Sequence, residues 1–202
     1  RFTGRNTGTQ DDTAITGSGT LNIQGSTAVT NTASINTGNF TNTNTEGFIN
    51  NGTLTVNTTG SNSASLTGTG SLNIAGTFTN SAGLSQKNMT ISASGYLSTN
   101  ADNLSITNTI TNNGTLTINA GTNTNAITGS GTLNIQGSTA VINTGSITAG
   151  TFTNTNTAGF INNGTLTVNT TGTNSNSLIG TGTMTVAGTF TNNAVLTQNA
   201  LN

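Results

Sequence analysis

FINNGTLTVNTTGSNSASLTGTGSLNIAGTFTNSAGL, residues 48–84, carries a large apolar residue at nearly every sixth position. The grid consists of Phe48, Leu54, Leu66, Leu72, Phe78 and Leu84, with Gly60 in its gap. A matching grid consists of Phe160, Leu166, Leu178, Met184, Phe190 and Leu196, and a shorter one of Leu104, Ile110 and Leu116. No helical period of 3.6 residues runs long enough to compete with this spacing.

Short alternating phrases surround the apolar residues. In residues 70–76, Leu72 and Ile74 point to one side while Ser71 and Asn73 point to the other, which predicts a short strand with one buried face. The phrase G-[TS]-[LM]-x-[IV] recurs at 19–23, 52–56, 70–74, 114–118, 131–135, 164–168 and 182–186. Asn-Asn-Gly at 50–52, 112–114 and 162–164 predicts corners, because Asn and Gly tolerate the left-handed conformation.

Three short strands and three corners fill one turn of the chain. Such a turn cannot bury its inner face alone, so turns must stack. The sequence therefore predicts an all-β fold, a β-solenoid of about 10–11 rungs of roughly 18–20 residues, with a length of roughly 50 Å. Asn side chains at equivalent corners are expected to form amide ladders along the axis.

The chain also contains a long duplication, and the six-residue period runs within each copy. Residues 15–29 read ITGSGTLNIQGSTAV, and residues 127–141 read the same, at an offset of 127 − 15 = 112 residues. We interpret residues 1–202 as a single solenoid, a segment of a longer chain or polymer, with duplicated halves 15–84 and 127–196 and an atypical connecting stretch 85–126. Tyr96, Lys87 and Asp102 lie in the least regular part, residues 84–108, which is expected to form a loop or a special rung.

Composition excludes several classes of protein. Charged residues are 3% of the chain, against about 25% in ordinary soluble domains, and Thr with Asn make up roughly four residues in ten. Disordered chains are usually rich in Pro and strongly charged, whereas this chain has 0 Pro and a net charge of −1. Three basic residues, Arg1, Arg5 and Lys87, cannot neutralise a nucleic-acid backbone, and no apolar run is long enough to span a membrane.

The phrase L-x-I-x-G-x-F-x-N-x-A-x-L, residues 72–84, resembles the haemagglutinin-type repeats of filamentous bacterial adhesins and of autotransporter passenger domains. The resemblance covers nearly the whole chain. It implies a right-handed parallel β-helix that is exported and displayed on a bacterial surface. Phe-Ile-Asn-Asn at 48–51 and 160–163 also matches the F-x-x-N motif of chlamydial polymorphic outer-membrane proteins, but the companion G-G-A-[IL] motif is absent. A left-handed β-helix would share the six-residue period; the wandering rung length favours the right-handed form.

Catalytic chemistry is not expected. The acidic residues are Asp11, Asp12, Glu46 and Asp102, Ala158 replaces Glu46 in the second copy, and the chain has no His. Sugar hydrolysis needs paired carboxylates, and a Ser or Thr nucleophile needs a base. Asp11 and Asp12 could hold a weak calcium ion, but a solvated loop is the simpler interpretation. The sequence therefore predicts no catalytic, cofactor-binding or metal-binding residues and no cofactor.

Three further patterns bear on the surface and the core. Thr-x-Thr phrases at 53–55, 151–153, 165–167 and 183–185 place both hydroxyls outward on one strand and resemble ice-binding solenoids, although irregular rung lengths should break a flat lattice. The pairs Phe40/Phe152, Phe48/Phe160 and Phe78/Phe190 are expected to stack in the core. Glycosylation sequons occur at Asn39, Asn51, Asn57, Asn88, Asn103 and Asn169.

Two functions follow as expectations. The first is a non-catalytic stalk or passenger segment of a bacterial adhesin, extracellular or on the cell surface, with a host or surface ligand as a further partner. The alternative is a subunit of an extracellular filament that stacks on itself head to tail, because an almost uncharged surface gives little repulsion between copies. Ice or crystal-surface binding is a minor alternative.

Overall fold

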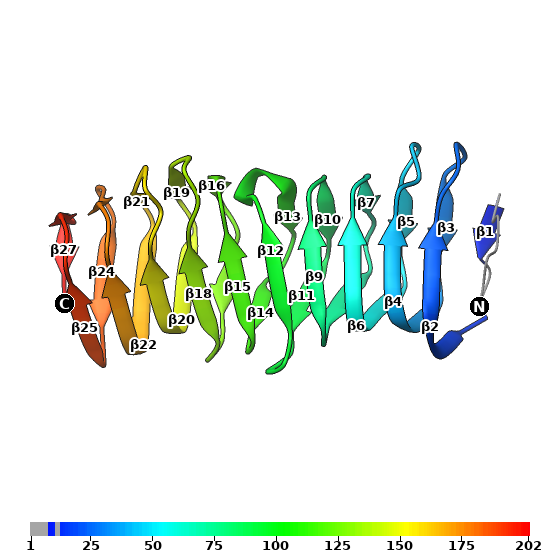
Figure 1. Ribbon diagram of the computed structural model, residues 1–202, viewed down its shortest axis with the longest axis horizontal. Helices are drawn as coiled ribbons and strands as arrows, with labels where there is room; N and C mark the ends of the chain where they lie inside the picture. The colour runs from blue at the N-terminus through cyan, green and yellow to red at the C-terminus, as the bar shows by residue number, and fades with distance from the viewer. Residues whose placement is uncertain (1–7, 11–12) are drawn as a thin grey trace.

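The computed structural model describes residues 8–10 and 13–202 and shows a straight rod of stacked turns (Figure 1). Every strand pairs in parallel with its equivalents in neighbouring turns, so the strands form three ladders along the rod. The described residues contain no α-helix, and a short 3₁₀ helix, η1, spans Ala101–Asn103. About ten turns of about 19 residues are present, which confirms the predicted β-solenoid.

The first and second ladders belong to one hydrogen-bonded sheet. Five long strands pass from the first ladder into the second: β2 (Ile15–Ile23), β4 (Ser34–Asn42), β6 (Thr53–Asn62), β20 (Ser146–Asn154) and β22 (Thr165–Asn174). The other strands of the first ladder are β8 (Ser71–Ile74), β11 (Asn88–Ile91), β14 (Ile110–Asn112), β17 (Ile127–Thr128), β24 (Thr183–Val186) and β27 (Ala200–Leu201). Those of the second are β9 (Thr77–Asn80), β12 (Tyr96–Thr99), β15 (Thr115–Ile118), β18 (Thr132–Ile135) and β25 (Thr189–Asn192).

The third ladder is divided into two sheets, which meet beside η1. The sheet nearer the N-terminus contains β1 (Gly8–Gln10), β3 (Val29–Asn31), β5 (Phe48–Asn50), β7 (Leu66–Thr67), β10 (Leu84–Gln86) and β13 (Leu104–Ile106). The other contains β16 (Gly121–Asn123), β19 (Val141–Asn143), β21 (Phe160–Asn162), β23 (Leu178–Ile179) and β26 (Leu196–Thr197). The stretch 84–108, expected to be a loop or a special rung, is mostly strand, and its special feature is η1.

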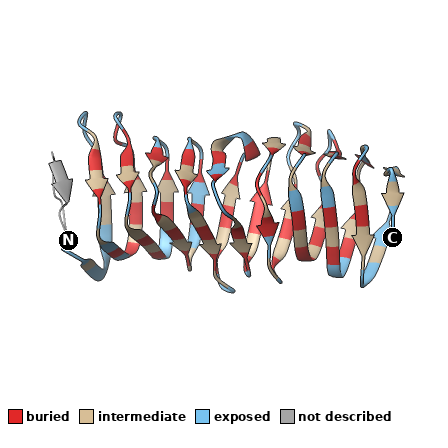
Figure 2. Ribbon diagram, turned by 180° about the vertical axis from the view of Figure 1, so that it is seen from behind, coloured by how far each residue is buried: buried red, intermediate tan, exposed pale blue. Residues whose placement is uncertain are grey.

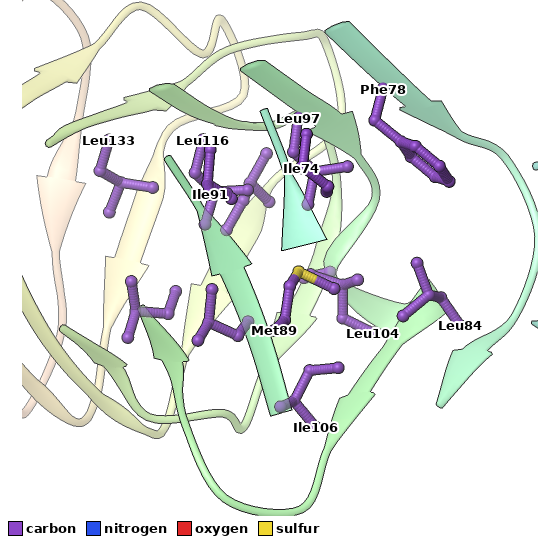
Figure 3. Close-up of a cluster of buried hydrophobic side chains, with 14 of the residues drawn as sticks. Ile74, Phe78, Leu84, Met89, Ile91, Leu97, Leu104, Ile106, Leu116 and Leu133 are labelled. Carbon is purple, nitrogen blue, oxygen red and sulfur yellow. The ribbon is translucent and has the colours of Figure 1, made fainter. Parts of the chain in front are cut away.

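The six-residue grid corresponds to the inward positions of successive ladders. Phe48 lies inward on the third ladder, Leu54 on the first and Gly60 on the second, and each is buried. Side chains from all three ladders meet in one hydrocarbon core, shown in Figure 3 around Met89, Leu97 and Leu104. Buried and more exposed residues alternate along the strands (Figure 2). The alternation places one face of each strand in the core, as the phrases predict.

The recurring phrase G-[TS]-[LM]-x-[IV] does not mark one fixed place in the turn. Residues 52–56 and 70–74 lie on the first ladder, whereas residues 114–118 and 131–135 lie on the second. The phrase therefore identifies a strand with an inward Leu or Met and an inward Ile or Val, and either ladder can use it. The variation in turn length lies in the corners, because the Cα partners run in register within each short strand.

The glycine of the Asn-Asn-Gly corners has a different role from the expected one. Gly52 does not have a positive φ. A Cβ at Gly52 would instead fall less than 3.0 Å from the backbone of Ala33 in the preceding turn. The prediction of a left-handed corner glycine was wrong here, and the corner needs Gly because two turns of backbone approach too closely for a side chain.

The aromatic rings pack in the core as expected, but each ring contacts rings of its own copy and not its counterpart in the other copy. The rings of Phe40 and Phe78 are stacked with centroids 6.2 Å apart, although Gly60 occupies the turn between them. In the second copy, Phe152 and Phe190 lie 6.5 Å apart across Gly172. Two turns should separate such rings by about 9–10 Å. The phenyl rings therefore lean into the space that the glycine leaves free.

Candidate functional site

The described residues carry three charged side chains. Glu46, Lys87 and Asp102 are all exposed and lie in different turns. The Asp102 carboxylate accepts a hydrogen bond from the backbone N–H of Thr122 at 2.7 Å, so it has a local structural contact. Within the described ranges, no three His, Cys, Asp or Glu residues gather where they could hold a metal ion.

The predicted calcium candidates Asp11 and Asp12 lie outside the described residues, as do Arg1 and Arg5. Glu46 lies in the loop before Gly47, and its counterpart Ala158 lies in the equivalent loop before Gly159. Both positions are exposed, so the loop has the same form with or without a carboxylate.

Buried asparagines form the first of two amide rows, at the end of the second ladder. The Nδ2 of Asn42 donates to the Oδ1 of Asn62 at 2.8 Å, and the Nδ2 of Asn62 donates to the Oδ1 of Asn80 at 2.8 Å. The second copy repeats the row through Asn154, Asn174 and Asn192, with 2.8 Å for each hydrogen bond. Each side-chain amide therefore hydrogen-bonds to the amide of the next turn, which removes most of the free-energy cost of burying these polar groups.

A second amide row lies at the end of the third ladder. In this row a longer side chain, Gln, takes the place of Asn at one turn. Asn31 donates to Asn50 at 2.7 Å, but the next turn has Gly68 at this place and offers no side chain. The Oε1 of Gln86, one turn further along, accepts from the Nδ2 of Asn50 at 2.7 Å. Gln198 accepts from Asn162 in the same way across Gly180. The extra methylene of Gln lets the row pass over a turn without an amide.

The amide ladders expected at equivalent corners exist, and the second row includes Asn50 and Asn162 of the predicted Asn-Asn-Gly corners. The rows are formed by inward Asn residues at the ends of strands, as in the phrases TFTN and FIN, which end at Asn80 and Asn50. The signal was present, because Asn closes these alternating phrases at an inward position. The exposed Asn51 makes a different contact, in which its Oδ1 accepts from the backbone N–H of Thr69 at 3.1 Å.

The outer faces carry hydroxyl groups in columns. The four predicted Thr-x-Thr pairs point outward, on either side of the buried residues Leu54, Phe152, Leu166 and Met184. They do not form one array: the pair at 151–153 lies on the second ladder, whereas the other three pairs lie on the first. The third ladder of the second copy instead shows Ile142, Ile161 and Ile179 outward on successive turns.

No family model, curated protein or solved structure gives a significant match to this chain. The part of the chain that the structure describes also has no helix long and apolar enough to cross a membrane. The surface presents hydroxyls and amides that donate and accept hydrogen bonds, and the described residues bring no acid and base together.

Proposed function

We propose that this chain is a non-catalytic stalk segment of an exported bacterial surface protein, which mediates adhesion or holds other parts away from the cell. The main supporting observation is that the 112-residue duplication amounts to six whole turns. The column of inward residues passes from Ile15 to Ile127 through six strand pairs. Duplicating whole turns lengthens the rod and leaves its cross-section unchanged.

Two further observations support a role in which surface and length matter more than chemistry. The core and both amide rows are formed by side chains that face inward, where a ligand has no access. The resemblance of residues 72–84 to haemagglutinin-type adhesin repeats points to the same class of protein. The partners we propose are neighbouring parts of a longer chain, or other copies of this one, together with a host or surface ligand.

A deletion of whole turns tests the proposal. Removing residues 35–146 joins Ser34 to Ile147, the residue that follows Ser146, the counterpart of Ser34. The rod should stay folded and shorten by about 29 Å, since six turns are lost at about 4.8 Å each. Removing residues 35–140 is the matched control, because it joins Ser34 to Val141 and places a third-ladder strand in a first-ladder position.

The readout is the reach and attachment of bacteria that display the chain. Gold-labelled antibody against an epitope at the end of the rod away from the cell should lie closer to the cell for the in-phase deletion, and attachment to surfaces should fall. Unchanged reach and attachment would contradict a stalk role. Electron microscopy of the purified chain across concentrations separates the alternative: long filaments that repeat one chain along the axis would favour a self-assembling fibre over a stalk.

A further inference from the structure

The outer side of the second ladder in the last four turns is an almost pure threonine surface. We call this the hydroxyl face; it consists of Thr132, Asn134, Thr151, Thr153, Thr171, Thr173, Thr189 and Thr191, on β18, β20, β22 and β25. All eight side chains are half-buried or exposed. The face begins at β18, because Thr117 at the matching place on β15 is buried.

Variation in turn length does not disturb this face. Thr132 pairs with Thr151, Thr151 with Thr171, and Thr171 with Thr189, without a slip. The register shift in β20 falls between Ala149 and Thr151, at the corner before the face begins. In these four turns, the irregular rung lengths therefore do not interrupt the register of the face. The hydroxyl groups repeat about every 4.8 Å along the rod and about every 6.6 Å along a strand.

Three features restrict the side chains and strands of the hydroxyl face before anything binds. Thr is branched at Cβ, which restricts its rotamers. The hydroxyls of Thr151 and Thr171 lie 3.3 Å apart and hydrogen-bond across turns. The amide row of Asn154, Asn174 and Asn192 links the same strands from inside. Binding would therefore cost little conformational entropy.

Charge narrows the choice of ligand. No charged residue occurs after Asp102, so the entire second copy is neutral. Such a surface cannot select an ionic partner, but a neutral lattice of hydrogen-bonding oxygens suits it. The first copy has the same face with Asn39 and Ser61 in place of Thr151 and Thr173. Both differences make the second copy richer in threonine, so that methyl and hydroxyl groups lie side by side at every position of the face except Asn134.

We propose that the hydroxyl face binds the surface of ice. The Thr hydroxyls repeat regularly in two directions, so an ordered layer of water held by them could continue into an ice crystal. The neutral charge and the restricted rotamers favour this ligand over a flexible or charged one. Ice binding is separate from the stalk role, and either could hold without the other.

Thr171 and Thr167 provide a matched test on one strand. Both point outward from β22, Thr171 at the centre of the hydroxyl face and Thr167 on the first ladder. We would measure the freezing hysteresis, ice-crystal shape and inhibition of recrystallisation caused by the purified chain. Thr171→Lys should reduce activity by about tenfold, the scale of losing a central contact, whereas Thr167→Lys should retain it. Circular dichroism would confirm that both variants fold.

Three results would overturn the proposal. The first is no effect of the unaltered chain on ice at any soluble concentration. The second is an equal loss in both Lys variants, or a loss only in Thr167→Lys. The third is binding to microcrystalline cellulose or chitin with no effect on ice, which would assign the face to a polysaccharide. Thr171→Val is a milder second variant: it keeps the shape, so partial loss with intact folding supports a contribution of the hydroxyl.

Discussion

Replacing Gly60 by Ala should destabilise the rod through the aromatic stack beside it. The new Cβ would lie less than 3.0 Å from Cδ2 and Cε2 of Phe78, whose side chain is fully buried. Gly60 has no positive φ, so Ala meets no backbone strain. Overpacking of a core costs about 1–3 kcal/mol, and Gly→Ala returns about 0.4–1 kcal/mol by restricting the unfolded chain. The net loss should be about 1–2 kcal/mol.

Gly172→Ala is the matched comparison, because its Cβ would meet the ring of Phe190 in the same way. Phe190 is only half-buried, so its ring can turn aside, and the net effect should be near zero. Hydrogen exchange is the suitable assay, because a solenoid opens locally and amides of β6 and β9 report on this site. Equal protection in Gly60→Ala and the parent, or an equal loss in Gly172→Ala, would refute the reasoning. Adding Phe78→Leu to Gly60→Ala should restore part of the loss.

Three other substitutions, with Asn192→Ala as a control for the first, test the buried polar groups. Asn62→Ala removes the middle of the first amide row and should cost about 2–3 kcal/mol in local opening, whereas Asn192→Ala, at an exposed row end, should cost less. Gln86→Asn shortens the bridge to Asn50 and should cost about 1–3 kcal/mol, measured by protection of the β5 amides in hydrogen exchange; an unchanged β5 would disprove the bridge. Thr117→Val should raise the melting temperature, because the buried Thr117 hydroxyl has no hydrogen-bond partner.

The spacing of the apolar residues predicts much of this fold. Three ladders with one grid residue each give a turn of about 18 residues, so the grid of 48–84 predicts both the inward positions and the turn length. The spacing could not predict on which ladder each phrase lies. The phrases at 70–74 and 131–135 have the same pattern yet lie on different ladders. The ladder on which a phrase lies depends on which corner contains an extra residue. The pattern of apolar residues does not reveal the length of a corner.

The roles of individual polar residues were harder to foresee than their places. A glycine in an Asn-Asn-Gly corner suggests a left-handed turn, but Gly52 serves the close approach of another turn, which only the stacked structure reveals. Gln86 likewise reaches Asn50 across two turns because Gly68, in the turn between them, has no side chain to accept the hydrogen bond. The hydroxyl face needed the register of four strands before its grid could be recognised.

The amide rows also explain why the duplication must consist of whole turns. Each inner Asn needs an acceptor or donor in the adjacent turn, so a fractional turn would set an amide against hydrocarbon. The polar groups at both ends of the first row have hydrogen-bond partners. At one end, the Oδ1 of Asn42 accepts from the backbone N–H of Asn44 at 3.3 Å. At the other end, the hydroxyl of Thr99 accepts from Asn80 at 3.1 Å and donates to the carbonyl of Asn100 at 3.0 Å. Beyond Thr99 the same column continues as buried Ile118 and Ile135 before Asn154 begins the next row. A six-turn unit thus contains a complete row with both ends satisfied, and joining such units leaves no buried amide of this row without a partner.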